Sequence, residues 1–303
     1  MNMPKLKPFS FLVWFHVAVL ALAVILLIKQ KGQPARSKEK IVVLTIDGMI
    51  TGERGSMGRG ASVSNIVHTI NDMREQDDVK ALVVRINTPG GSVGAVQEIY
   101  SALRKFKGKG KFVVASFGDI SASGGYYLAS MADKIVCHPG TITGSIGVVM
   151  QMPNVEGLLG KVGVKMNVIK SGSMKDAGSP FRTMTEQEAA SFRELIMDAY
   201  SQFYNAVKLG RKMEDAELKP LADGRVFSGR MALEKHLVDH LGDLEDAISE
   251  AKKLSGLEDK EPRIVYHSQE RPFERLFELL SRSPVRDFAE LAVGKTELMY
   301  VMQ

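Results

Sequence analysis

The chain has 303 residues, of which 45% are hydrophobic and 25% are charged. A chain of this length and composition is globular and can bury one large hydrophobic core or two smaller ones. Its net charge of +5 is mildly basic, but the lysines and arginines are scattered without interleaved aromatic residues, which argues against nucleic-acid binding. The single cysteine, Cys137, excludes an intramolecular disulfide framework and a cysteine-rich metal site.

The first distinctive segment is the apolar run Phe9–Ile28, in which His16 is the only ionisable residue. A helix of about 20 residues rises about 30 Å, the thickness of a bilayer's hydrocarbon core. A polar, charged stretch follows in place of a small-residue cleavage site, so we expect a retained membrane anchor and linker in residues 1–40. Lysines and arginines after the run outnumber those before it, so the positive-inside rule alone places the following domain in the cytoplasm.

The rest of the chain alternates short apolar runs with amphipathic segments. Runs rich in β-branched residues predict strands at Ile41–Ile46, Lys80–Ile86, Phe112–Ser116, Lys134–Cys137 and Val164–Ile169. Apolar residues at helical spacing predict helices over about 62–73, 92–106 and 185–211, and Thr185 and Glu188 have capping-box spacing. This alternation indicates an α/β domain, which we place at residues 41–303. The glycine-rich stretch 52–60 is expected to be a loop, and the apolar tail 272–303 to dock on the domain or on a neighbouring subunit.

Three glycine-rich turns follow predicted strands, at Asn87–Ser92, Ser123–Gly125 and Thr141–Gly147. Paired glycines between a strand and a helix let backbone N–H groups approach a ligand, and the helix N-terminus favours an oxyanion. The alternative is a tight turn that requires only a positive φ. Ligands of open α/β sheets bind at the edge where such turns gather. Ser123, directly before a helical run, is either a helix N-cap or a nucleophile.

A nucleophilic serine needs a base, and no histidine is well placed for that role. His236 and His240 have i, i+4 spacing on a predicted helix, but no HExxH pattern surrounds them. We therefore favour solvated histidines over a zinc site, and we expect no metal and no cofactor. The remaining candidate is Lys175, in the small-residue segment Ser171–Pro180. A lysine acts as a base only when desolvation favours its neutral form, and Asp176 would oppose this if it pointed the same way.

Four motifs occur together in one order: Asn87–Val93, Ala122–Tyr127, Thr141–Gly147 and Lys175–Pro180. They resemble the signature set of the signal peptide peptidase A (SppA) family of membrane serine proteases, in its short form with one protease domain. The resemblance extends from about Ile41 to Ala251. It implies an α/β fold of the crotonase/Clp-protease kind, a spiral of ββα units, with an N-terminal transmembrane helix.

The resemblance also implies the roles of individual residues. Ser123 matches the family's nucleophile and Lys175 its general base, which together form a Ser-Lys dyad. Ser145 matches a serine that orients the lysine, and Gly90 and Gly91 match the backbone turn of the oxyanion hole. One departure is at the start of the segment 236–239, where His236 stands in place of the family's usual glycine. This departure concerns the local turn at 236–239.

For the whole protein, the resemblance implies a membrane-anchored serine endopeptidase that degrades cleaved signal peptides and other unfolded apolar peptides. It implies a homo-oligomer in which serine and lysine can come from adjacent subunits. It places the protease domain outside the cytoplasm, and we prefer this to the charge count because a long domain can translocate regardless of flanking charge. Two alternatives stay open: a crotonase-like acyl-CoA enzyme, which would need acidic residues near the thioester, and a membrane scaffold with an inactive site.

Overall fold

The computed structural model describes residues 16–17, 19–21, 38–52, 61–267 and 299–301. Most of the predicted anchor lies outside these residues, as do residues 53–60 of the predicted loop 52–60 and most of the apolar tail. Within the described ranges, no helix has the length and apolar character needed to cross a membrane.

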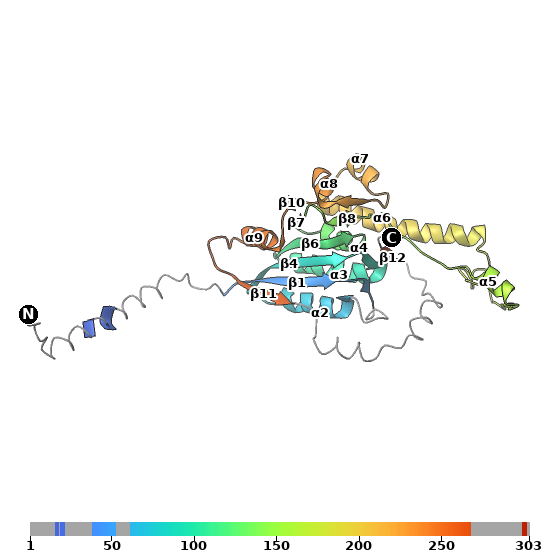
Figure 1. Ribbon diagram of the computed structural model, residues 1–303, viewed down its shortest axis with the longest axis horizontal. Helices are drawn as coiled ribbons and strands as arrows, with labels where there is room; N and C mark the ends of the chain where they lie inside the picture. Colours follow the sequence, from blue (N-terminus) through green and yellow to red (C-terminus); the bar gives the residue numbers. More distant parts are fainter. Residues whose placement is uncertain (1–15, 18, 22–37, 53–60, 268–298, 302–303) are drawn as a thin grey trace, which may run out of the picture.

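A large sheet forms the centre of the domain (Figure 1). Its strands, in spatial order, are β10 (His240–Leu241), β7 (Lys134–Cys137), β6 (Phe112–Ala122), β4 (Val79–Thr88), β1 (Lys40–Asp47) and β11 (Arg263–His267). Neighbours along this path are parallel. At the end of β6, β8 (Ile142–Gly144) adds a further parallel pair and is itself antiparallel to β9 (Val226–Ser228). The predicted α/β class is confirmed.

A second, small sheet consists of β12 (Met299–Val301), β5 (Gly90–Ser92), β2 (Ile50–Thr51) and β3 (Ala61–Ser62). The chain twice passes from a large-sheet strand through the small sheet to a helix. First β1 is followed by β2, β3 and α2 (Val63–Arg74), and then β4 is followed by β5 and α3 (Val93–Lys107). The second passage is the ββα unit that the family resemblance implied, and the first is the same unit with the short strand β3 added.

Both faces of the large sheet are buried, which explains why its strands are almost continuously apolar. On β1, Val42 and Leu44 belong to the larger core, which α2, α3, α4 (Gly124–Ser130) and the second half of α6 (Glu186–Arg211) cover. Ile41 and Val43 point to the opposite face, where α9 (Leu244–Leu254) packs. The short elements α7 (Asp215–Leu218) and η1 (Lys219–Leu221) connect α6 to β9.

The long predicted helices are confirmed. The four residues of α2 that the helical spacing assigned to the core are the buried ones: Val63, Ile66, Ile70 and Met73. At the start of α6, Thr185 and Glu188 form the predicted capping box, since each side chain accepts a hydrogen bond from the other residue's backbone N–H. These local signals were sufficient because they are satisfied within one or two turns of helix.

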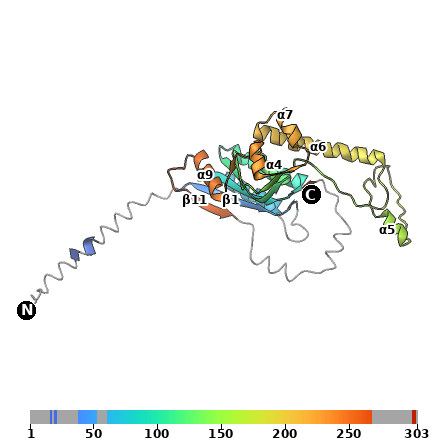
Figure 2. The same ribbon diagram turned by 45° about the horizontal axis from the view of Figure 1, so that its top comes forward.

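The predicted strand Val164–Ile169 is wrong. No strand is assigned there, and all six residues are exposed. They belong to residues 151–185, here called the arm, which carries α5 (Glu156–Lys161) and extends away from the sheet at the N-terminal end of α6 (Figures 1 and 2). A strand needs a neighbour for its backbone N–H and C=O groups. Within the described part of the chain, this segment has no such neighbour.

The predicted helix carrying His236 and His240 is also wrong. Helix α8 (Gly229–Glu234) ends before both residues, and His240 lies in β10. His236 has a φ of 58°, in the left-handed region that glycine adopts most readily. The turn at this position therefore suits the glycine usual in the family, and here histidine adopts it instead.

Candidate active site

Ser123 lies where a long strand turns into a helix. β6 ends at Ala122 and α4 begins at Gly124, and Ser123 between them has a φ of 53° and a ψ of −113°. This backbone conformation costs a non-glycine residue about 1–3 kcal/mol. Two hydrogen bonds hold it, from the Ser123 N–H to the Gly144 carbonyl and from the Tyr127 N–H to the Ser123 carbonyl, both 2.8 Å long. Strained turns from a strand into a helix are known to present nucleophilic serines.

The Ser123 hydroxyl is buried and has no hydrogen-bond partner among the described residues. Ser123 occupies the N-cap position of α4, yet its side chain makes no capping hydrogen bond. The capping role considered from the sequence is therefore wrong. Leaving a buried hydroxyl unsatisfied costs about 1–3 kcal/mol, so the group calls for an explanation other than stability.

The turn Gly90–Gly91 packs directly against the start of α4. A Cβ atom at Gly124 would lie 3.2 Å from both the Gly90 Cα and the Gly91 nitrogen. At Gly91 a Cβ atom would lie 1.9 Å from the Ile50 carbonyl oxygen, so only glycine fits beside β2. Gly90 has a φ of 125°, which also requires glycine. The structure thus brings the predicted oxyanion turn and the Ser123 turn together.

Thr88 organises the Gly90–Gly91 turn, a role that the sequence motifs did not predict. Its buried Oγ1 accepts a hydrogen bond from the Gly90 N–H at 3.1 Å. The Gly90 N–H is thereby used inside the turn, and the N–H groups of Gly91 and Gly124 become the candidates to bind an oxyanion. Gly124 is in the first turn of α4, where N–H groups lack an intrahelical acceptor. The available signal was a hydroxyl residue directly before Pro89-Gly90.

Ser145 lies beside Ser123. β6 and β8 pair Ala122 with Gly144, so the two serines are the next residues of two neighbouring strands. Ser145 has a φ of 51° and is 6% exposed, and its N–H donates to the Arg225 carbonyl at 2.8 Å. Two buried serines in strained conformations therefore leave the sheet next to one another.

Lys175 is not brought to Ser123 within the chain. It is exposed on the arm, which extends away from the sheet (Figures 1 and 2). Its backbone belongs to a series of turns, in which the Lys175 N–H donates to the Gly172 carbonyl and the Ala177 N–H to the Met174 carbonyl, both at 3.1 Å. Its ammonium group makes no ion pair with any residue that the structure describes.

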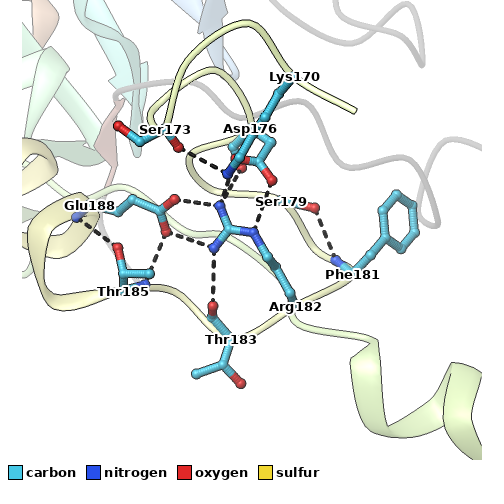
Figure 3. Close-up of polar contacts among 9 residues, drawn as sticks. All are labelled: Lys170, Ser173, Asp176, Ser179, Phe181, Arg182, Thr183, Thr185 and Glu188. Carbon is cyan, nitrogen blue, oxygen red and sulfur yellow. Dashed lines mark hydrogen bonds and ion pairs between the residues drawn. The ribbon is translucent and has the colours of Figure 1, made fainter. Parts of the chain in front are cut away.

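Asp176, the neighbour of Lys175, points into a cluster of charges (Figure 3). Arg182 donates to both of its carboxylate oxygens, at 3.0 and 2.9 Å, and the Lys170 Nζ lies 2.5 Å from its Oδ1. Hydrogen bonds from these two cations hold the pKa of the Asp176 carboxyl well below its usual range. Asp176 is thus an ionised carboxylate committed to Arg182 and Lys170.

The described residues give little support to a cysteine nucleophile or to a metal site. Burial raises the pKa of the Cys137 thiol to about 11, so at neutral pH this cysteine is protonated and a poor nucleophile. Across residues 38–52 and 61–267, no group of three or more His, Cys, Asp or Glu side chains is arranged to hold a metal ion.

The chain is similar to several known proteins that are named as proteases. The family model described as "Peptidase family S49" matches residues 105–258. A putative protease of Synechocystis sp. is 44% identical over 73% of this chain and 76% of its own length. A putative signal peptide peptidase SppA of Enterococcus faecium is 38% identical over 74% of this chain and 66% of its own length. Protease 4 of Salmonella typhi is 34% identical over 78% of this chain, which spans only 38% of that relative. Among solved structures, a mutant of the 1510-N membrane-bound stomatin-specific protease has a TM-score of 0.48 and 15% identity, covering 77% of this chain and all of that chain.

Proposed function

The chain belongs to peptidase family S49, and on this premise we propose that it is a serine endopeptidase whose nucleophile is the Ser123 hydroxyl. The observation that carries the proposal is the environment of this hydroxyl. It is buried, has no hydrogen-bond partner among the described residues, and stands on a strained turn against the Gly90–Gly91 backbone. A fold that maintains a strained turn and an unsatisfied hydroxyl in one residue gains nothing in stability from them, whereas a nucleophile must be held in a fixed position and its hydroxyl must be free of competing hydrogen-bond partners.

In the proposed reaction, the Ser123 Oγ attacks the scissile carbonyl while its proton passes to the neutral amine of Lys175. The resulting oxyanion accepts hydrogen bonds from the backbone N–H groups around Gly91 and Gly124. The lysine then donates the proton to the leaving amine, and an acyl-enzyme ester forms at Ser123. Water, deprotonated by the same amine, hydrolyses this ester and regenerates the serine. Ser145, next to Ser123, orients the lysine amine.

We assign Lys175 to a neighbouring copy of the chain. The arm exposes a run of apolar side chains that solvent alone would not favour, including Val164, Val168 and Ile169. Large exposed apolar patches mark interfaces, and an extended segment without a strand partner can pair with another chain. A second copy is the partner that such an arm suits, because no described residue of the same chain supplies a base to the Ser123 hydroxyl. The active form is accordingly a homo-oligomer with each dyad shared between subunits.

The substrate is proposed to be an unfolded apolar peptide, including the remnants of signal peptides. The edge of β5 next to Ser123 pairs antiparallel with β12, which matches Met299 with Ser92, Tyr300 with Gly91 and Val301 with Gly90. An edge that accepts one extended segment can accept another, so a substrate would add to β5 by backbone hydrogen bonds. Small or aliphatic residues before the scissile bond are expected to be preferred, since apolar neighbours would keep the lysine desolvated.

We further propose that residues 1–40 anchor the protein in a membrane, with the protease domain outside the cytoplasm. The support for this is the apolar run Phe9–Ile28. An anchor would hold the domain beside signal-peptide fragments in the bilayer and raise their effective concentration.

The test combines a serine-reactive fluorophosphonate probe with a library of fluorogenic peptides. We expect the wild-type chain to be labelled at Ser123 and to cleave after leucine and alanine faster than after lysine and aspartate. We expect the Lys175→Arg protein to be inactive, because guanidinium stays protonated. Turnover by a pure Ser123→Ala protein would contradict the nucleophile, and an active Lys175→Arg protein would contradict the base. No labelling and no turnover by the wild-type oligomer would favour an inactive scaffold. Faster cleavage after charged residues would overturn only the substrate class.

A further inference from the structure

We propose that Arg182 and Glu188 are positioning residues for Lys175, because they hold the Asp176 carboxylate in a fixed ion-pair network and so prevent it from pairing with the neighbouring Lys175 amine. This inference rests on the proposed function, in which Lys175 must be neutral to accept the serine proton. Arg182 and Glu188 lie outside the four family motifs, whereas Asp176 belongs to the motif Lys175–Pro180.

The geometry of Arg182 is that of a two-sided clamp (Figure 3). One side of the guanidinium binds the Asp176 carboxylate through Nε and Nη2, at 3.0 and 2.9 Å. The other side binds Glu188, through Nη1 to Oε2 at 3.0 Å and through Nη2 to Oε1. Nη2 also donates to the Asp176 carbonyl at 3.1 Å and Nη1 to the Thr183 carbonyl at 3.2 Å. Such bidentate pairs fix direction as well as distance, which a lysine in place of Arg182 would not do.

Glu188 connects this clamp to a rigid element. Its side chain is only 2% exposed and lies in the first turn of the 26-residue helix α6. Its Oε2 also accepts the Thr185 backbone N–H at 3.0 Å, so the same carboxylate completes the capping box and receives Arg182. Nearby, a Cβ atom at Gly178 would lie 3.3 Å from the Phe192 ring and 2.7 Å from the Met152 sulfur, which shows how closely this loop approaches α6. The loop carrying Lys175 is therefore held against a helix.

The charges of the cluster balance. Lys170 and Arg182 contribute two positive charges, and Asp176 and Glu188 two negative charges. Asp176 is 13% exposed and already receives hydrogen bonds from two cations. A free carboxylate one residue from Lys175 would stabilise the protonated amine, since an opposite charge within about 4–6 Å favours the charged form. With Asp176 engaged, that stabilisation is withheld from Lys175.

The competing explanation is that the clamp only ties the arm to α6. Both explanations predict weaker activity when Arg182 is replaced, so the loss of activity does not separate them. They differ when Asp176 is removed as well. If the clamp serves Lys175, a second substitution that neutralises Asp176 should reverse the increase in the proton affinity of the Lys175 amine. If the clamp is merely structural, the second substitution removes one more contact and should restore neither the activity nor its pH dependence.

The first experiment measures kcat/KM against pH for the full-length oligomer carrying Arg182→Gln, Glu188→Gln, Asp176→Asn, or Arg182→Gln together with Asp176→Asn. For Arg182→Gln and for Glu188→Gln we expect the acidic limb of the profile to move up by about one pH unit or more, about tenfold in rate on that limb. In the Arg182→Gln/Asp176→Asn protein the limb should return toward its wild-type position, even if the maximum rate stays low. Arg74→Gln is the matched control, because it breaks an arginine–glutamate pair outside the arm and should leave the profile unchanged. An unmoved limb in Arg182→Gln, or a limb that Asp176→Asn fails to restore, would overturn the proposal.

The second experiment reads the amine without catalysis. In a Ser123→Ala background, the acetylation rate of Lys175 by acetic anhydride is followed against pH by mass spectrometry. Arg182→Gln should move its midpoint to higher pH, and the double variant should reverse the movement. A midpoint that is the same in all of these proteins would overturn the clamp proposal. If Lys175→Ala retained full peptidase activity while the midpoints moved as expected, the clamp would stand as a property of the loop and the assigned base would be wrong, so the two failures are distinguishable.

Discussion

Replacing Ser123 with alanine should abolish peptidase activity while leaving the fold as stable as before, or more stable. The expectation follows from the state of the hydroxyl, which is buried and without a hydrogen-bond partner among the described residues. Alanine removes one oxygen atom, keeps the Cβ atom, and leaves the backbone hydrogen bonds of the turn to Gly144 and Tyr127 in place.

The sign of the stability change is the informative quantity. Removing an unsatisfied buried hydroxyl recovers up to about 1–3 kcal/mol, from which a small packing loss of up to about 1 kcal/mol is subtracted. The net expectation for Ser123→Ala lies between no change and about 3 kcal/mol of added stability. If the hydroxyl were a working N-cap, the same substitution would cost about 0.5–2 kcal/mol. The two interpretations of this serine therefore predict opposite signs.

Ser130 provides a matched control at the other end of the same helix. It is also buried, but its Oγ donates to the Tyr127 carbonyl at 2.8 Å. Ser130→Ala should lower the free energy of unfolding by about 0.5–1.5 kcal/mol and keep peptidase activity. Urea unfolding and peptide turnover of the three proteins would be compared at equal concentration, because an oligomer's apparent stability depends on it. A Ser123→Ala protein that is destabilised as much as Ser130→Ala would refute the reasoning.

Three further outcomes are expected. Mixing inactive Ser123→Ala and Lys175→Ala chains, after dissociation and reassembly, should restore activity in about a quarter of the sites if each dyad is shared between subunits; verified mixed oligomers without activity would show that each chain carries its own base. Deleting 299–303 should lower KM for peptides with little change in kcat, because β12 competes for the edge of β5; an unchanged or higher KM would contradict this competition. Arg182 holds the pKa of the Glu188 carboxyl at about 2, below its ordinary 4.5. The contribution of the ionised Glu188 to the stability of the fold is therefore complete above pH 4.5 and is lost as the pH falls toward 2. Hydrogen exchange at the start of α6 should accelerate across that range, and in Glu188→Gln it should already be fast at neutral pH; equal exchange in both proteins would argue against the anchoring role.

The elements that the sequence predicted well are those whose signals are local or are satisfied inside one chain. Strand β7 spans the predicted residues Lys134–Cys137, and helix α2 buries the four side chains that its spacing selected. The capping box of α6 involves residues three positions apart. Burial on both faces of a parallel sheet also leaves a strong trace, since it requires continuous apolar runs.

The errors have a different physical origin. Val164–Ile169 has the composition of a strand but no partner within the described chain, and composition does not report whether a partner exists. The role of Thr88 depends on a side-chain hydrogen bond within one turn, which the spacing of glycines did not reveal. The commitment of Asp176 to Arg182 and Lys170 depends on side-chain directions in a loop, and no periodic pattern encodes them.

The arm and the active site depend on one another in the proposed assembly. Ser123 stands at the end of β6 in the large sheet. The pairing of β6 with β8 and the close packing of the glycine turns hold its backbone in one position. Lys175 is exposed on an arm that has little core of its own, and a base that stands apart from the nucleophile cannot serve it. Within each chain, the Arg182 clamp holds the Lys175 loop on α6. In the proposed assembly, a second copy also covers the apolar side chains of the arm and receives Lys175 beside its Ser123. If so, the isolated chain is inactive because its base and nucleophile are apart, and association creates the site. Activity per chain should then rise with protein concentration across the range in which the oligomer forms, and follow the oligomer fraction measured by sedimentation.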